Sequence, residues 1–291
     1  MIDIKQLNPQ KDVLVIFGAT ASGKSAAGVD IARQTNGVII NADASQIYKE
    51  APILANLPTA RDFAAADHKL FAYLSITEES SVASWLKLCA HEIESAQTKG
   101  KIPIVVGGSG MYISALLYGI SDIPSQSTKK QEAIATYNQL GAEKFLELMQ
   151  KIDPIHTAKD SQRLIRAYEV YLITQKPFSF YASQPKIKYV NAEFINIFIN
   201  PVREDLYAKI NLRTESMFKE GVVEEAARIL KLTQQQTHIK KILGLSEIIN
   251  YLDGKQTLEN TISLVQQKTR NYAKRQITWF NHQIAEKIIR I

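Results

Sequence analysis

The strongest constraint on this chain is a glycine-containing loop near its N-terminus. Residues 18–25 read Gly-Ala-Thr-Ala-Ser-Gly-Lys-Ser, with the G-x-x-x-x-G-K-S spacing of a phosphate-binding loop. The apolar run 13–17 predicts a strand before the loop, and residues 25–34 predict a helix after it. Glycines let backbone N–H groups turn toward one point, and the helix N-terminus adds positive potential there. The loop therefore predicts a site for a di- or triphosphate.

Each residue of this loop is a candidate contact for the phosphates. Lys24 supplies a mobile cation, and the hydroxyl of Ser25 is a candidate ligand for Mg²⁺. The motif predicts the ligand group but does not predict the reaction. The expected diphosphate-binding residues are Gly18, Ala19, Thr20, Ala21, Ser22, Gly23, Lys24 and Ser25.

Composition excludes several classes of protein. The chain has 291 residues, of which 45% are hydrophobic and 22% charged, as in ordinary globular domains. No apolar run approaches the ~20 residues that a membrane helix needs, and the first residues lack the apolar core of a secretory signal. The single cysteine, Cys89, excludes an intrachain disulfide and is expected to be a buried thiol. We expect a cytoplasmic protein, a monomer, with no membrane contact.

Charge is divided unevenly along the chain. Residues 1–150 carry 13 Lys and Arg against 15 Asp and Glu, whereas residues 151–291 carry 22 against 14. The positive field therefore belongs to the half that lacks the phosphate loop. A small phosphorylated ligand requires no such asymmetry, but a nucleic acid does. A well-solvated basic surface explains the charge equally well.

Two further predicted strands, 38–40 and 102–106, end in polar or glycine-rich segments. Ligands of open α/β sheets bind at the carboxyl ends of the strands. Asp43 follows the first of these strands, where a carboxylate serves as general base, metal ligand or helix cap. The turn 107–110 (GGSG) follows the second and suits close approach to a ligand, although Ser109 is equally a candidate helix cap.

Alternating strands and helices predict an α/β fold, a parallel sheet around the phosphate loop with flanking helices. Residues 50–80 show no regular pattern and are expected to be irregular. A change in character after Pro124 predicts a helical insertion domain over residues 119–191. Residues 1–118 and 192–291 then form the core domain.

The C-terminal part is predicted to be almost entirely helical from residue 203 to residue 286. In the helix expected over 222–232, the apolar spacing places Glu224, Glu225 and Arg228 on the outward face.

Two basic groups are candidate nucleic-acid contacts. Arg163 and Arg166 lie one helical turn apart in the insertion. Lys274 and Arg275, beside Trp279, belong to a basic stripe on the last predicted helix that includes Lys268 and Arg270. A solvated helix with a packed tryptophan is the competing interpretation.

Six segments together resemble one family, the tRNA dimethylallyltransferases. In chain order they read GATASGKS, DASQIY, VGGSGMY, DSQRLIRA, GLSE and KRQITWF, at residues 18–25, 43–48, 106–112, 160–167, 244–247 and 274–280. The chain departs from the family pattern at Ala44 and Leu245, which replace Ser and Tyr. It also lacks the lysine that the family carries near residues 55–59.

The resemblance implies transfer of a dimethylallyl group from dimethylallyl diphosphate to the exocyclic amine of the adenine 3′ of the anticodon in tRNA. It implies Asp43, Ser109 and Lys24 as catalytic residues, with Asp43 as the base, and Mg²⁺ as cofactor. The tRNA anticodon stem-loop is the expected partner. The residues expected to contact it are Asp43, Ala44, Ser45, Gln46, Ser109, Gln162, Arg163, Leu164, Ile165, Arg166, Lys274 and Arg275.

Two other functions share the phosphate loop and the aspartate. A free-adenylate isopentenyltransferase has no need of the basic C-terminal half or the helical insertion. A P-loop kinase of a small metabolite would use Asp43 on a hydroxyl group and would turn over ATP.

Overall fold

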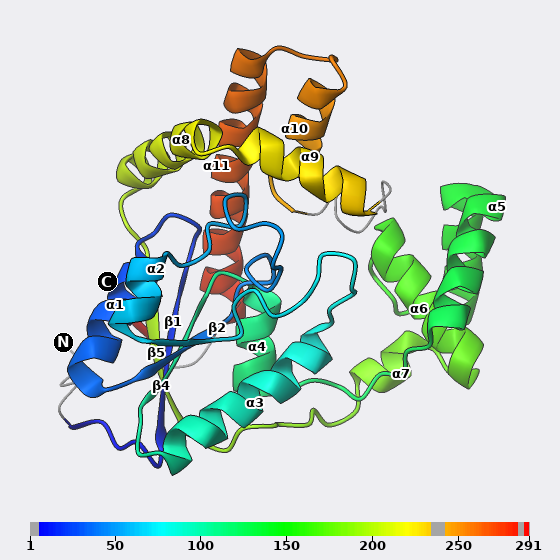
Figure 1. Ribbon diagram of the computed structural model, residues 1–291. Coiled ribbons are helices and arrows are strands. Elements are labelled where there is room, and N and C mark those ends of the chain that lie inside the picture. The colour runs from blue at the N-terminus through cyan, green and yellow to red at the C-terminus, as the bar shows by residue number, and fades with distance from the viewer. Residues whose placement is uncertain (1–5, 234–241, 285–287, 291) are drawn as a thin grey trace. The chain divides into compact units, whose positions relative to one another are not determined.

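The computed structural model describes residues 6–233, 242–284 and 288–290. Within them, six strands form one sheet whose neighbours all pair in parallel, in the order β3-β2-β4-β1-β5-β6. Figure 1 labels the four inner strands, β2, β4, β1 and β5. The strands are β1 (Asp12–Gly18), β2 (Val38–Asn41), β3 (Asp67–Lys69), β4 (Pro103–Gly107), β5 (Glu193–Ile199) and β6 (Ile288–Arg290). The predicted α/β class with a parallel core is confirmed.

Helices occupy most of the remaining described chain. They are α1 (Lys24–Thr35), α2 (Ala60–Ala65), α3 (Val82–Thr98), α4 (Gly110–Tyr118), α5 (Ser127–Ile152), α6 (Ser161–Thr174), α7 (Phe178–Ala182), α8 (Arg203–Lys219), α9 (Val222–Thr233), α10 (Leu245–Leu252) and α11 (Leu258–Gln283). None of the described helices is long and apolar enough to span a membrane.

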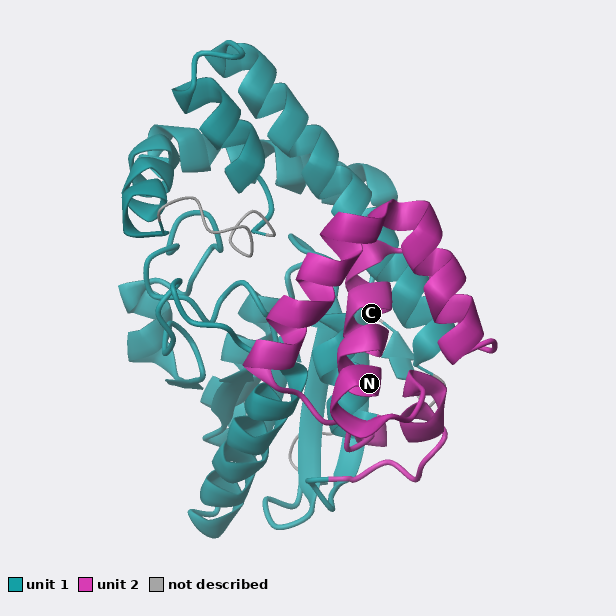
Figure 2. Cartoon of the chain, turned by 90° about the vertical axis from the view of Figure 1, so that its right-hand side faces the viewer, with its two compact units in different colours: residues 1–117, 189–291 teal, residues 118–188 magenta. Residues whose placement is uncertain are grey.

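The chain forms two compact units (Figure 2). The first consists of residues 1–117 and 189–291 and contains all six strands. The second, residues 118–188, is helical, and α5 and α6 pack against each other in it. A two-residue bridge between Ile120 and Ile187 joins the two ends of the second unit.

Strand β1 is buried on both faces, as a central parallel strand must be. Leu14 and Ile16 point to the side covered by Ala32 of α1. Phe17 points to the opposite side, where its ring lies 4.9 Å from the ring of Phe280 in α11. Helices α1 and α11 therefore cover β1 from opposite sides of the sheet.

The structure corrects two predictions about local structure. Residues 50–80 are not entirely irregular, because they contain α2 and the edge strand β3. Helix α2 begins with a capping box between Thr59 and Asp62, a short-range signal that hydrophobic periodicity does not detect. The last helix was predicted to reach residue 286 but ends at Gln283, and the strand β6 follows it.

Glu225 in α9 was predicted to face outward, and this prediction is wrong. Its side chain is fully buried, and its two carboxylate oxygens accept hydrogen bonds from the backbone N–H groups of Ile53 (2.9 Å) and Leu54 (2.7 Å). Burial raises the pKa of Glu225, and these two hydrogen bonds oppose that shift. A buried carboxylate thus fixes the 53–54 segment, which no pattern in α9 indicates.

Replacing Glu225 should destabilise the protein. Glu225→Ala leaves two backbone N–H groups without an acceptor, and each such group costs about 1–3 kcal/mol. We expect the free energy of unfolding to fall by about 2–4 kcal/mol, measured by urea denaturation. The exposed neighbour Glu224 supplies the control, since Glu224→Ala should change it by less than ~0.5 kcal/mol. Equal urea midpoints for the two variants would contradict this role.

Candidate active site

The phosphate loop lies between a strand and a helix, as its sequence predicts. It leaves β1 at Gly18 and enters α1 at Lys24, with Gly23 in the left-handed conformation (φ 97°) just before the helix. Lys24 is buried, and its ammonium group donates a hydrogen bond to the carbonyl oxygen of Ala19 (3.3 Å). Burial lowers the pKa of Lys24, whereas the negative charge of Asp43 raises it. The loop thus holds a desolvated cation near a carboxylate.

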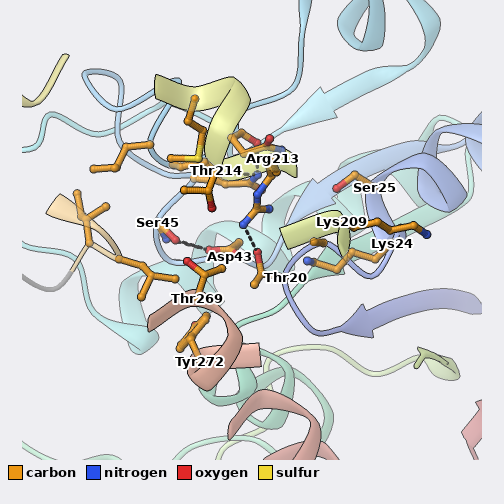
Figure 3. A pocket seen from close by; sticks show the side chains of 18 of the residues that line it. Thr20, Lys24, Ser25, Asp43, Ser45, Lys209, Arg213, Thr214, Thr269 and Tyr272 are labelled. Atoms are coloured by element: carbon orange, nitrogen blue, oxygen red, sulfur yellow. Dashed lines mark hydrogen bonds between the residues drawn. The ribbon is translucent and has the colours of Figure 1, made fainter. Parts of the chain in front are cut away.

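A cavity of about 530 Å³ opens beside this loop (Figure 3). The phosphate loop, the segment after β2 and the helices α8 and α11 line it, so it lies wholly within the first compact unit. Its polar lining includes Thr20, Lys24, Ser25, Asp43, Ser45, Lys209, Arg213, Thr214, Thr269 and Tyr272. Its apolar lining includes Leu54, Met217, Ile242 and Val265. One cavity thus combines cationic, acidic and apolar walls.

Asp43 is held by the buried Asn41 at the end of β2. The backbone N–H of Asp43 donates to the Asn41 side-chain oxygen (2.8 Å), and the Asn41 amide donates to the carbonyl oxygen of Asp43 (3.0 Å). Asn41 is fixed in turn by the indole N–H of Trp85, which donates to its backbone carbonyl (2.8 Å). The position of Asp43 is therefore set by hydrogen bonds at the end of β2.

The Asp43 carboxylate keeps one oxygen free within the described chain. Oδ1 accepts hydrogen bonds from the N–H (3.0 Å) and the hydroxyl (2.7 Å) of Ser45, whereas no described residue bonds Oδ2. These bonds orient the carboxylate and leave Oδ2 able to accept a proton. Oδ1 thus makes the capping bond to the next turn, while Oδ2 leaves the base and metal-ligand alternatives for Asp43 open.

Ser109 does not cap α4 with its side chain. Its backbone carbonyl accepts hydrogen bonds from Tyr112 and Ile113, while its hydroxyl accepts one from the N–H of Ala44 (2.8 Å). The hydroxyl proton remains available to donate. Ser109 therefore links the glycine turn after β4 to the segment that carries Asp43.

Two cationic residues of the site were not predicted from the sequence. Arg213 of α8 lines the cavity, and its guanidinium donates to the hydroxyl of Thr20 (2.8 Å) (Figure 3). Burial lowers the pKa of Arg213, and the charge of Asp43 opposes this shift. Lys209 lies one turn earlier and lines the same cavity. The four-residue spacing of these cations is the only signal for them in the sequence, and charged residues at that spacing are ordinary on any solvated helix.

The backbone N–H of Thr20 does not point toward the phosphate site, although this was expected for a residue of this loop. Its N–H donates instead to the side-chain oxygen of Gln276 in α11 (2.9 Å). The same glutamine donates to the carbonyl oxygen of Gly108 (2.8 Å). The side chain of Gln276, which was not predicted to belong to the site, therefore contacts both glycine loops.

The basic residues predicted to contact nucleic acid differ in their surroundings. In the second unit, the Arg163 side chain is 75% exposed, with Asp160 3.5 Å away. Arg166 pairs instead with the buried carboxylate of Glu169 (2.9 Å) and donates to the carbonyl oxygen of Ile123 (3.1 Å). Arg166 therefore has a structural role within its unit.

Other predicted contact residues also have structural partners. Leu164 is buried in the core of the second unit, so its side chain offers no surface to RNA. Gln46 donates to the carbonyl oxygens of Ala55 (3.2 Å) and Asn56 (2.6 Å), which line the cavity. Gln46 thus supports the cavity wall.

The predicted basic stripe on α11 is only partly free. Lys268 pairs with Glu247, and Arg270 donates to the side-chain oxygen of Asn211 (2.7 Å). Lys274 and Arg275 are exposed, and Arg275 also lines the cavity. Of the four basic residues in the predicted stripe, Lys274 and Arg275 therefore remain the candidate contacts for nucleic acid.

Comparison with known proteins assigns the family. Residues 46–283 match the family model described as IPP transferase. A tRNA dimethylallyltransferase of Rickettsia bellii (strain RML369-C) is 40% identical over 286 residues, which are 96% of this chain and 91% of that protein. The crystal structure of the full-length tRNA isopentenylpyrophosphate transferase of Bacillus halodurans covers 97% of this chain and 90% of its own, with 29% identity and a TM-score of 0.69.

A eukaryotic dimethylallyltransferase acting on tRNA shares the fold, with a TM-score of 0.79 at 24% identity, over 96% of this chain and 74% of that one. The chain belongs to the IPP transferase family. The resemblance predicted from the six segments is confirmed, as is the predicted class of enzyme, a prenyltransferase.

Proposed function

We propose that this chain transfers a dimethylallyl group from dimethylallyl diphosphate to the exocyclic amine of the adenine 3′ of the anticodon in tRNA. The observation that carries the proposal is a single cavity in which a phosphate loop, the buried Lys24, the partly buried Arg213 and an oriented carboxylate meet. The family membership supports the same reaction. In this reaction a carbon–oxygen bond to the diphosphate breaks, a carbon–nitrogen bond to adenine forms, and the amine loses one proton.

The diphosphate end of the cavity neutralises the leaving group. Lys24, Arg213 and Lys209 place positive charge around the phosphate loop. Charge that is fixed before the reaction stabilises the developing pyrophosphate more effectively than mobile water does. The apolar side chains of Leu54 and Met217, in the same cavity, suit the five-carbon tail.

The oxygen donors at this end fit Mg²⁺. The Ser25 hydroxyl faces the cavity and is the protein oxygen proposed to bind the ion. Mg²⁺ is bound by one or two protein oxygens, with substrate phosphates and water completing its coordination. Among the described residues no group of three or more His, Cys, Asp and Glu could hold a metal by itself. When bound, the ion would add positive charge to the leaving group.

Asp43 is the proposed base. The amine of adenine is a weak nucleophile because its lone pair is delocalised into the ring, so removal of its proton assists attack. The free Oδ2 of Asp43 accepts this proton, while Ser45 holds Oδ1. The hydroxyl of Ser109 accepts the N–H of Ala44 and is available to hydrogen-bond either the adenine amine or the Asp43 carboxylate. Adenine must leave the anticodon-loop stack to enter the cavity.

The partner in this proposal is the anticodon stem-loop of tRNA, bound by a monomer in the cytoplasm. Unstacked loop bases are the usual targets of specific RNA recognition. The +8 net charge of residues 151–291 and the exposed Lys274, Arg275 and Arg163 support a polyanionic partner.

Incubation with labelled dimethylallyl diphosphate tests the function directly. With unmodified tRNA and AMP offered in parallel, label should enter tRNA alone, and ATP should not be hydrolysed. Label in AMP would establish a free-adenylate enzyme instead. Hydrolysis of ATP with no affinity for dimethylallyl diphosphate would establish a kinase.

Removal of the proposed base should slow the chemical step. We expect Asp43→Ala to lower kcat by about 10²–10⁴-fold, because proton acceptance is lost, with tRNA affinity little changed. Single-turnover kinetics measures the rate, and Asp30→Ala, which removes an exposed carboxylate from α1, is the control. Near-normal turnover by Asp43→Ala would leave Asp43 with only a structural role.

Salt dependence tests the RNA surface. A lysine that binds phosphate releases counterions, so Lys274→Ala should weaken tRNA binding and reduce the slope of log Kd against log salt by about one unit. Lys87→Ala, at an exposed position of α3, is the matched control and should leave the slope unchanged. A lower melting temperature with an unchanged slope for Lys274→Ala would contradict the RNA contact.

A further inference from the structure

Helix α11 docks on both glycine loops through one side chain. Gln276 is 6% exposed, and its amide oxygen accepts the N–H of Thr20 (2.9 Å) while its amide nitrogen donates to the carbonyl oxygen of Gly108 (2.8 Å). The two partners fix the orientation of the amide, because a reversed amide would set donor against donor and acceptor against acceptor. A side chain of this length that carries one acceptor and one donor satisfies both loops at once.

The second glycine turn is shaped to receive this helix. A Cβ atom on Gly108 would lie 2.6 Å from the amide nitrogen of Gln276, and one on Gly110 would lie 2.5 Å from the ring of Trp279. Gly108 also lies near the reactive carboxylate, since the same Cβ atom would be 3.5 Å from Oδ2 of Asp43. Glycines at these positions therefore permit contact between α11 and the turn beside the proposed base.

The first loop is restrained at Thr20 from two sides. Gln276 holds its N–H, and the guanidinium of Arg213 donates to its hydroxyl (2.8 Å). An N–H bonded to a protein acceptor is not available to the phosphates, so the ligand cannot be what orders this part of the loop. The restraint instead sets the loop before the ligand arrives, and binding loses less conformational entropy as a result.

We propose that Gln276 is a positioning residue that locks the phosphate loop to the second glycine turn and thereby presets both for the diphosphate. The inference rests on the proposed function for the identity of the substrate. Gln276 acts through Thr20 and Gly108 rather than through contact with the reacting atoms. Loss of its amide should weaken diphosphate binding, whereas binding of tRNA alone should change little because Gln276 is buried.

Three variants test this role, with inorganic pyrophosphate and Mg²⁺ as the probe in calorimetry. Gln276→Met keeps the length of the side chain and removes both hydrogen bonds, so pyrophosphate affinity should fall about tenfold to a hundredfold. Gln266→Met is the matched control, because Gln266 lies on the same helix and donates only to Asn211 and Glu215 of α8. It should bind pyrophosphate as the unmodified protein does. Normal affinity in Gln276→Met would overturn the proposal.

The pH dependence of pyrophosphate binding by the Gln276→Glu variant distinguishes the positioning role from a role in packing alone. When protonated, the new carboxyl group donates to Gly108 and accepts from Thr20, and so restores both bonds. When ionised, it faces the carbonyl oxygen of Gly108. Pyrophosphate affinity relative to the unmodified protein should therefore recover as the pH falls. A pH-independent ratio would overturn the proposal even if Gln276→Met failed to fold.

Failure of the proposed function is distinguishable from failure of this inference. If the unmodified protein did not label tRNA but the pyrophosphate results held, the positioning role would stand for a different diphosphate reaction. If tRNA became labelled and the Gln276 variants bound pyrophosphate normally, only the positioning role would fall.

Discussion

Parallel pairing of β1 between β4 and β5 is the constraint on which the site depends. The register sets Phe17 opposite Gly107 on one side and Phe198 on the other. Parallel strands end at one edge, so the phosphate loop after β1 and the glycine turn after β4 emerge together. Strand β2 pairs with the other side of β4, with Asn41 opposite Val106, and this places Asp43 at the same edge. Segments far apart in the sequence therefore become one site through backbone hydrogen bonds alone.

Helices α8 and α11 supply the side chains of the site that do not come from the sheet edge. The edge supplies the loop and the carboxylate, while α8 supplies Arg213 and α11 supplies Gln276. Both helices bond the same residue, Thr20, so the C-terminal part of the chain is needed to order a loop at the N-terminus. Phe280 anchors α11 on Phe17 of β1. Packing on one side of the sheet thereby fixes polar geometry at its edge.

The sequence predicts the local part of this arrangement and not the long-range part. The loop, the strands beside it and the position of Asp43 follow from contiguous patterns, in which periodicity and glycine spacing report on neighbours in the chain. Arg213 and Glu225 were missed because a helix pattern treats every charged residue as outward-facing. The environment of each is determined by a partner about 170 to 190 residues away, Thr20 for Arg213 and Ile53 for Glu225. Pairings between residues so far apart in the chain produce no periodic pattern in the sequence.

The ion pairs of the basic residues are a second feature that the sequence does not predict, and they change the surface proposed to bind RNA. The second half of the chain has an excess of basic residues, and their spacing on the last helix predicts a broad stripe, but two of these cations pair with carboxylates within the protein. Lys268 pairs with Glu247, and Arg166 with Glu169, whose carboxylates are almost fully buried. A buried carboxylate requires a partner, so these cations stabilise the fold and add little to the field that a polyanion experiences. The part of α11 that we propose to contact RNA phosphates is then the exposed pair Lys274 and Arg275. These residues directly precede Gln276, so the helical turn that bonds the phosphate loop also carries the positive charge proposed to attract the polyanion.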